Sequence, residues 1–385
     1  MQRRIPAVLM RGGTSKGLFF HERDLPADPA VRGRVILAAY GSPDPHRRQI
    51  DGIGGALSVS SKVAIISASP SPDYDVVYDF GQVPIDRPIV DFKGNCGNMS
   101  SAVGPFAVDE GLVPAVAPVT RVRIHQKNTD KLIVAEVPVK DGKFNFEGDY
   151  AIDGVPGRGS RILLRFVDPG GAVTGKLLPT GHRKESFEVR GAGTVEVSCV
   201  DAANPFVFVR AESLGLKGSE TEELERRAEI ASMLEAIRCQ AAVRLGITAT
   251  EEEATRRSQA VPKVAMVAAS KAYTALNGRA IEAHEVDVVA RMMSMGTLHR
   301  SYAVSGAVAT AGAAMIPGTV VYDLVAGSAR GKDLLHIGHP GGVIDVGAVI
   351  ETRSGTSIYK EAVLGRTARR LMEGHVLVPE RFFNR

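Results

Sequence analysis

Cys96 lies in the sequence Asn95-Cys96-Gly97-Asn98, directly before a small, apolar run that is typical of a helix. The first N–H groups of a helix have no internal partner and carry the positive end of the helix dipole. A thiol at such a position has a lowered pKa, and the neighbouring N–H groups can bind a carboxylate. A small buried cysteine at a tight turn is the alternative, since free cysteines are usually buried. The flanking Gly and Asn residues leave the two interpretations even.

Lys62 is a second candidate for proton transfer. It follows the small hydroxyl residues Ser60 and Ser61 and opens an apolar strand. Desolvation at the start of such a strand lowers the pKa of an amine, and a neutral amine can take a proton. A lysine at a strand end with its amine in water is the alternative, and it is favoured when Lys62 is considered alone because lysine is rarely buried.

The glycine-rich segment Met10–Gly17 has the sequence MRGGTSKG. Its glycines lie too close to the lysine for the phosphate-binding spacing G-x-x-x-x-G-K-[ST], so a nucleotide site is disfavoured. Backbone N–H groups together with Arg11, Thr14 and Ser15 can bind a carboxylate instead. A glycine-rich hairpin without a ligand is an equal alternative.

The second half of the chain has two turns rich in His and Gly. Arg300, beside His299, is suited to clamp a carboxylate. His299 and His339 are expected to be hydrogen-bonding turn residues, and either can line a cleft. The isolated histidines form no metal-binding pattern, and no dinucleotide or serine-hydrolase motif follows a suitable strand. The sequence motifs therefore give no indication of a metal or dinucleotide site.

Length and composition narrow the class of protein. The chain has 385 residues, of which 44% are hydrophobic and 23% charged, as in ordinary globular proteins with more than one domain. The net charge is only +4 and the basic residues form no block, which disfavours nucleic-acid binding. The three cysteines form no CxxC pair, which favours a reducing compartment. With no signal-peptide core and no apolar run of membrane-spanning length, a cytoplasmic enzyme is expected.

The hydrophobic pattern predicts many strands and few helices. Two helices are predicted to be amphipathic, Glu222–Leu245 and Val286–Met295. Two others carry hardly any charge and are predicted to be buried on all sides, Gly97–Glu110 and Gly306–Ile316. The predicted strands are β-branched and bounded by turn residues: Ala7–Met10, Lys62–Ser67, Tyr74–Phe80, Arg121–Gln126, Leu132–Val139, Arg161–Phe166, Ser186–Val189, Thr194–Val200, Phe206–Arg210, Lys263–Ala268 and Gly342–Glu351.

The two uncharged helices indicate a weak internal repeat. Each begins after a small polar residue and a glycine, and each lies late in its half of the chain. This predicts two similar domains, each a curved sheet around one buried helix. The expected boundary lies in the Gly/Pro-rich stretch Asp168–Lys184, which gives domains 1–183 and 184–385.

The motifs taken together resemble the PrpF family over nearly the whole chain, in the expected order. They are MRGGTSKG at Met10–Gly17, GSPDP at Gly41–Pro45, QIDGIGG at Gln49–Gly55, SSK at Ser60–Lys62, GNCGN at Gly94–Asn98, CVDAANP at Cys199–Pro205, PKVA at Pro262–Ala265, HRSYAVSGA at His299–Ala307, IPGT at Ile316–Thr319 and GHPGG at Gly338–Gly342. The resemblance implies an α+β, diaminopimelate epimerase-like fold. It has two pseudo-symmetric domains, each a rolled β-sheet around a central helix, and the last strand can return to the N-terminal domain.

The resemblance also implies an activity. PrpF enzymes are cofactor-independent isomerases and tautomerases that shift a proton along the allylic system of a small unsaturated di- or tricarboxylate, such as 2-methylaconitate, aconitate or 4-oxalomesaconate. The family's proton-transfer groups correspond to Lys62 and Cys96. Related epimerases carry a cysteine in each domain, whereas Ser305 stands at the second helix start here, which disfavours a racemase.

The expected mechanism has Lys62 as the base and Cys96 as the acid or as a stabiliser of the intermediate. Oxyanion-type N–H donors would stabilise the dienolate charge. Cis–trans isomerisation and double-bond migration share this intermediate and stay open. The expected substrate-binding residues are Arg11, Thr14, Ser15, Ser60, Asn95, Gly97, Asn98, His299, Arg300, Ser305, Gly306 and His339.

Two other classes of function remain as alternatives. One is an accessory protein of an aconitase-like iron–sulfur dehydratase, to which the family resemblance suggests a functional link. The other is a carboxylate-binding protein without turnover. Base rates favour a homodimer.

Overall fold

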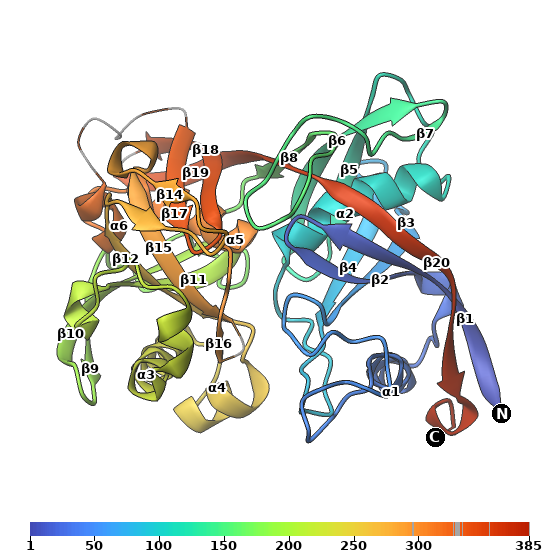
Figure 1. Cartoon of the computed structure of the whole chain (residues 1–385), viewed down its shortest axis with the longest axis horizontal. Coiled ribbons are helices and arrows are strands. Elements are labelled where there is room, and N and C mark those ends of the chain that lie inside the picture. Colours follow the sequence, from blue (N-terminus) through green and yellow to red (C-terminus); the bar gives the residue numbers. More distant parts are fainter. Residues whose placement is uncertain (295, 326, 328–331, 333, 354, 385) are drawn as a thin grey trace. The chain divides into compact units, whose positions relative to one another are not determined.

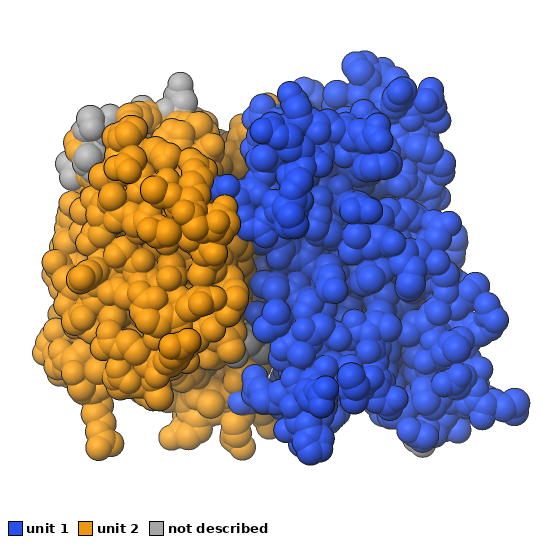
Figure 2. All heavy atoms as spheres, viewed as in Figure 1, with its two compact units in different colours: residues 1–164, 365–385 blue, residues 165–364 orange. Residues whose placement is uncertain are grey.

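A computed structural model describes the chain apart from residues 295, 326, 328–331, 333, 354 and 385. The chain forms two compact units: unit 1 contains residues 1–164 and 365–385, and unit 2 contains residues 165–364 (Figure 2). The boundary precedes the Gly/Pro-rich stretch in which the sequence places it. That stretch is held within unit 2, because the buried Asp201 carboxylate accepts hydrogen bonds from the N–H groups of Val173 and Thr174.

Unit 1 is a mixed sheet with two principal helices (Figure 1). Its main elements are β1 (Gln2–Gly12), β2 (Ser15–His21), α1 (Pro29–Tyr40), β3 (Lys62–Ala68), β4 (Val76–Gln82), α2 (Gly97–Asp109), β5 (Val119–Gln126) and β6 (Lys131–Lys140). The short β7 (Lys143–Phe144) follows. At β8 (Ile162–Val167) the chain passes into unit 2, and β20 (Ala368–Pro379) returns to unit 1 and pairs antiparallel with β1.

Helix α2 is buried along nearly its whole length, as the uncharged sequence predicts. Every residue from Gly97 to Val108 is buried. The small residues let the helix approach the sheet closely: a Cβ on Gly104 would lie 2.7 Å from Val137 Cγ2 on β6.

Helix α1 was not predicted, although both of its ends carry sequence signals. The Asp28 carboxylate accepts from the N–H groups of Ala30 and Val31, Pro29 is the first helical residue, and Gly41 ends the helix with φ at +68°. Such N-caps, N-terminal prolines and left-handed C-terminal glycines are common helix boundaries.

Unit 2 has a larger number of elements. Its strands are β9 (Glu185–Val189), β10 (Gly193–Ala202), β11 (Asn204–Arg210), β12 (Lys263–Ala269), β13 (Tyr273–Thr274), β14 (Ala280–Ile281), β15 (Val288–Ser294), β16 (Thr297–Leu298), β17 (Leu334–His339), β18 (Gly342–Arg353) and β19 (Thr356–Arg366), whose last two residues belong to unit 1. Its helices are α3 (Ala228–Arg244), α4 (Glu251–Arg257), α5 (Val304–Ala314) and α6 (Val320–Leu324). Helix α5 is buried throughout, as predicted.

The two units share one strand-pairing pattern. In unit 1, β1 to β6 pair successively as antiparallel, parallel, antiparallel, parallel and antiparallel neighbours. In unit 2, β10, β11, β12, β15, β17 and β18 repeat that order. The buried helix enters between the fourth and fifth strands of each set. The predicted internal repeat is therefore present in the topology.

Two of the predicted helices differ in the structure. The prediction of a helix over 286–295 is wrong, because Val288–Ser294 is strand β15, which pairs with β12 and β17; residue 295 lies outside the described residues. A strand buried on both faces reads as a continuous apolar run, which periodicity does not separate from a buried helix. The segment 222–245 is a 3₁₀ turn (Glu222–Arg226) followed by α3, with non-helical backbone at Arg227.

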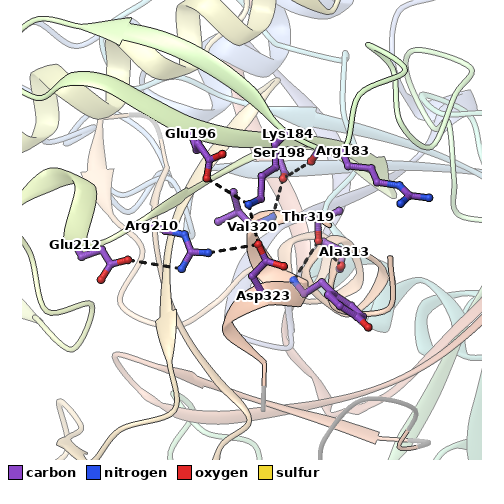
Figure 3. A network of polar contacts seen from close by, with 11 residues as sticks. Arg183, Lys184, Glu196, Ser198, Arg210, Glu212, Ala313, Thr319, Val320 and Asp323 are labelled. Atoms are coloured by element: carbon purple, nitrogen blue, oxygen red, sulfur yellow. Dashed lines mark hydrogen bonds and ion pairs between the residues drawn. The ribbon is translucent and has the colours of Figure 1, made fainter. Parts of the chain in front are cut away.

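A polar network fixes the C-terminal side of α5 to strands β10 and β11 (Figure 3). The Thr319 hydroxyl donates to the Ala313 carbonyl at 2.7 Å and accepts from the Tyr322 N–H. The Ser198 hydroxyl on β10 accepts from the Val320 N–H at 2.8 Å. The Asp323 carboxylate pairs with Lys184 and Arg210. Among the described helices, none has the length and apolarity needed to cross a membrane.

Candidate active site

Lys62 is buried at the first position of β3, with 7% of its surface exposed. Its Nζ donates a hydrogen bond to Gln82 Oε1 at 2.5 Å and lies 5.5 Å from the centre of the Phe80 ring. Burial lowers the pKa of the Lys62 ammonium below its ordinary value, and the Coulomb interaction with Cys96 acts in the opposite direction. The environment therefore favours a neutral amine.

The main chain at Lys62 is held from two sides. On β2, Gly17 lies opposite Lys62 in the parallel ladder, so close that a Cβ on Gly17 would lie 1.8 Å from the Lys62 carbonyl oxygen. From α1, the buried Tyr40 hydroxyl donates to the same carbonyl and accepts from the Leu18 N–H. These contacts fix the point from which the Lys62 side chain extends.

Gln82, the last residue of β4, is a site residue that the sequence analysis missed. Its side chain is buried, and its Nε2 donates to the carbonyls of Ser61 at 3.0 Å and Ser58 at 3.1 Å. A polar residue that ends an apolar strand antiparallel to β3 is the only local signal. The pairing of Gln82 with Lys62 becomes visible only in the register of the two strands.

Cys96 is the N-cap of α2, as predicted, with extended backbone and a half-buried free thiol. Its carbonyl accepts from the Ser100 N–H and hydroxyl. Cys96 interacts electrostatically with both Lys62 and Tyr78. Tyr78 is fully buried, and burial followed by the Cys96 charge raises the pKa of its phenol well above the ordinary value. Asn95 and Ser60 are also buried; Asn95 accepts from Ser100, and Ser60 donates to Leu57.

The turn between β1 and β2 lies on the first turn of α2. Gly13 has φ at +50°, and a Cβ there would lie 2.1 Å from Asn98 Oδ1. The same Asn98 oxygen accepts from the Thr14 N–H at 3.3 Å. The neighbouring Ser15 hydroxyl is buried and has no hydrogen-bond partner among the described residues. A buried polar atom of this kind is suited to a ligand.

Two arginines lie at this turn in different roles. Arg11 Nη1 donates to the carbonyls of Gly13 and Thr367, so it braces the turn rather than binding an anion through this atom. Arg366, which the sequence analysis missed, is 6% exposed, and its Cδ lies beside Gly13. A buried guanidinium next to a helix N-terminus adds positive charge where a carboxylate can bind.

The remaining predicted residues belong to unit 2. Ser305 and Gly306 lie in the first turn of α5, and the Ser305 hydroxyl accepts from Asn204 Nδ2 at 3.1 Å. His299 and His339 have the predicted turn role: His299 Nδ1 accepts from the Ser301 N–H, and His339 Nδ1 accepts from the Gly341 N–H. Arg300 does not have the predicted role of a carboxylate clamp in this structure, because its guanidinium is already paired. Its exposed guanidinium pairs with Glu222 and Glu225 on the surface.

Among the side chains that the structure describes, no three His, Cys, Asp or Glu residues come together to hold an ion.

The two units, each with the same strand pairing and one buried helix, define a diaminopimelate epimerase-like α+β fold. A crystal structure of a hydroxyproline epimerase from Agrobacterium vitis has this fold, with a TM-score of 0.56 over 98% of this chain and 94% of that chain at 14% identity. That similarity concerns the fold alone.

The chain belongs to the PrpF family, whose model, described as PrpF protein, matches residues 2–379. It is 46% identical over 379 residues to 3-methylitaconate isomerase of Eubacterium barkeri, covering 98% of each chain. It is 42% identical over 390 residues to 2-methyl-aconitate isomerase of Cupriavidus necator, again covering 98% of each. It is 42% identical over 378 residues to 4-oxalomesaconate tautomerase of Pseudomonas putida, covering 98% of this chain and 97% of that protein. A crystal structure of methylitaconate-delta-isomerase matches with a TM-score of 0.79 at 46% identity, covering 100% of this chain and 98% of that chain.

Proposed function

We propose that this chain is a cofactor-independent isomerase that moves a proton along the allylic system of a small unsaturated di- or tricarboxylate. The substrate class follows from the names of the relatives, which act on 3-methylitaconate, 2-methylaconitate and 4-oxalomesaconate. The observation that carries the proposal is the buried Lys62 amine close to the Cys96 thiol at the start of α2.

Proton removal is assigned to Lys62. Its neutral amine takes a proton from the carbon that is allylic to the substrate's double bond, and the electrons of that C–H bond spread into a dienolate. The negative charge collects on carboxylate oxygens, where the N–H groups of Gly97 and Asn98 at the start of α2 can stabilise it. A base whose pKa is tuned toward neutrality suits this step.

Proton return completes the reaction. The Cys96 thiol or the Lys62 ammonium delivers a proton to the other end of the allylic system, and the double bond moves by one position. Return to the original carbon after rotation about the transient single bond gives cis–trans isomerisation instead. If the thiol donates, the Lys62 ammonium and the thiolate must exchange a proton before the next turnover.

Substrate carboxylates have a suitable place in unit 1. The free N–H groups of α2, the Ser15 hydroxyl and the positive charge of Arg366 lie around the turn formed by Gly13 and Thr14. Four residues of unit 2 remain predicted substrate contacts: His299, Ser305, Gly306 and His339.

Proton NMR in deuterated buffer tests the proposal, with 3-methylitaconate, 2-methylaconitate and 4-oxalomesaconate offered separately. We expect deuterium incorporation or a new isomer with one of them, and loss of both in Lys62→Ala with substrate binding retained. Substantial turnover in Lys62→Ala would refute the assignment of the base. Binding without deuterium incorporation in the unmodified protein would indicate a carboxylate-binding protein instead.

A further inference from the structure

The Lys62 amine is held by an amide where many buried lysines are held by a carboxylate. Gln82 Oε1 accepts from Lys62 Nζ at 2.5 Å, and the described contacts of Nζ include no Asp or Glu side chain. A carboxylate at this distance would stabilise the ammonium. An amide oxygen is a neutral acceptor that can hydrogen-bond to either the amine or the ammonium.

The orientation of the Gln82 amide is fixed by its other end. Nε2 donates to the carbonyls of Ser58 and Ser61, and a rotated amide would place oxygen against both carbonyl oxygens. Oε1 is therefore the atom that faces Lys62. Strand β4 adds Phe80 and Tyr78 on the same face, because alternate residues of a strand share a side, and both are buried against the site.

We propose that Gln82 is the positioning residue of the base: it holds the Lys62 amine near Cys96 without supplying a negative charge that would keep the amine protonated. This inference rests on the proposed role of Lys62. It extends that role by naming the group that sets the position and protonation of the amine.

The other charged and titratable groups around Lys62 come from several elements. From α2, Cys96 acts on the Lys62 charge. From α1, Tyr40 bonds to the Lys62 carbonyl and not to its amine. On β2, Lys16 adjoins Gly17 and is exposed. On β4, Asp79 alternates with Tyr78 and Phe80, and its carboxylate pairs with Lys127 and accepts from Asn128. Beside β4, the main chain of the buried Asp91 pairs antiparallel with Gln82, and the Asp91 carboxylate accepts from the Lys93 N–H.

Three variants separate charge from position. Gln82→Glu keeps the shape and an acceptor facing Lys62 but adds a negative charge, and it also loses the donation from Nε2 to the Ser58 and Ser61 carbonyls. Gln82→Met keeps the approximate size but removes the acceptor together with the same donor. Asp79→Asn changes one charge on the opposite face of β4 as a control. Two measurements are made on each: kcat and KM against pH, and the titration of Lys62 by NMR of selectively labelled lysine (15Nζ and 13Cε), assigned by comparison with Lys62→Met.

We expect the Lys62 titration of Gln82→Glu to move upward by about one pH unit or more, since a unit is the scale of a close opposite charge. Its activity should fall about tenfold at neutral pH and recover as the pH rises. In Gln82→Met, kcat should fall by about 10- to 100-fold with KM within twofold, as misplacement of a catalytic group predicts. Asp79→Asn should leave both readouts near those of the unmodified protein.

Two results would overturn the inference: a Lys62 titration in Gln82→Glu equal to that of the unmodified protein, or a kcat in Gln82→Met within twofold of it. If Gln82→Met does not fold, the isosteric Glu variant decides alone. The NMR titration reports on Gln82 whether or not Lys62 is the base. Activity of Lys62→Ala refutes the proposed function separately.

Discussion

Replacing Gly17 by alanine tests whether the main chain of β2 sets the position of the base. Residue 17 carries no functional group, yet a Cβ there would lie 1.8 Å from the Lys62 carbonyl oxygen, and real contacts of this kind are at least 3.0 Å. The strand pair must therefore open by about 1.2 Å at Lys62, the difference between these two distances. The Tyr40 hydroxyl on α1 restrains the same carbonyl. The main chain at Lys62 must therefore move, and the Lys62 side chain moves with it.

A displacement of this size is large for catalysis. Misplacing a reacting group by about 1 Å can lower the rate by about 10²-fold, and crowding of a packed interior costs about 1–3 kcal/mol of stability. We expect Gly17→Ala to lower kcat by about 10²-fold and to lower Tm. The assay is isomerisation followed by NMR on the substrate identified above, together with thermal unfolding.

Gly33→Ala is the matched control. Gly33 lies in α1 with no atom within 4 Å of the added methyl, so the substitution should leave kcat unchanged and stabilise the helix by up to about 1 kcal/mol. A Gly17→Ala protein with kcat within threefold of the unmodified protein would refute the reasoning, because the strand contact would then not control the position of Lys62.

Three further predictions concern other parts of the chain. Lys62→Met should abolish turnover and raise Tm at neutral pH. Burial holds the pKa of folded Lys62 below its unfolded value of 10.5, so the protonated lysine destabilises the folded state. The increase in Tm should become smaller as the pH rises toward 10.5, and equal Tm values for the variant and the unmodified protein at every pH would contradict this prediction. Cys96→Ser should lower kcat by about 10²-fold or more if the thiol returns the proton; a kcat within threefold would assign that step to Lys62. Thr319→Val should lower the free energy of unfolding by about 1–2 kcal/mol, because the N-cap of α6 and the hydrogen bond to the Ala313 carbonyl are lost. The kcat per folded molecule should be unchanged. An unchanged Tm would show that the network of Figure 3 does not hold α5 in place.

The features predicted best from sequence are those with local causes. The start of α2 at Cys96 and the burial of α2 and α5 follow from small, uncharged residues and a glycine turn, which act over a few positions. The strand at Val288–Ser294 was mistaken for a helix because its apolar run has no period of two. Helix α1 was missed although Asp28 and Gly41 mark its ends.

Site residues that act through tertiary contacts could not be predicted in the same way. Gln82 is far from Lys62 in sequence and meets it only through the antiparallel register of β3 and β4. Arg300 stands in a promising motif, yet Glu222 and Glu225 engage its guanidinium. Local sequence shows which groups are present, whereas strand register and neighbouring charges decide which of them meet.

Because the two units share one strand-pairing pattern, residues at corresponding positions can be compared. The counterpart of Lys62 is Lys263, the first residue of β12, and the register of β12 with β15 extends to place Ser294 where unit 1 has Gln82. Lys263 and Ser294 line a cavity of about 240 Å³ together with Glu235 and Arg238, and Ala303 replaces Cys96 as the helix N-cap. The two units thus share a strand-pairing pattern but differ in the residues at corresponding positions. Only unit 1 has a thiol at the N-cap of its buried helix, and a chain with unequal halves is suited to a reaction whose two carbons are themselves unequal.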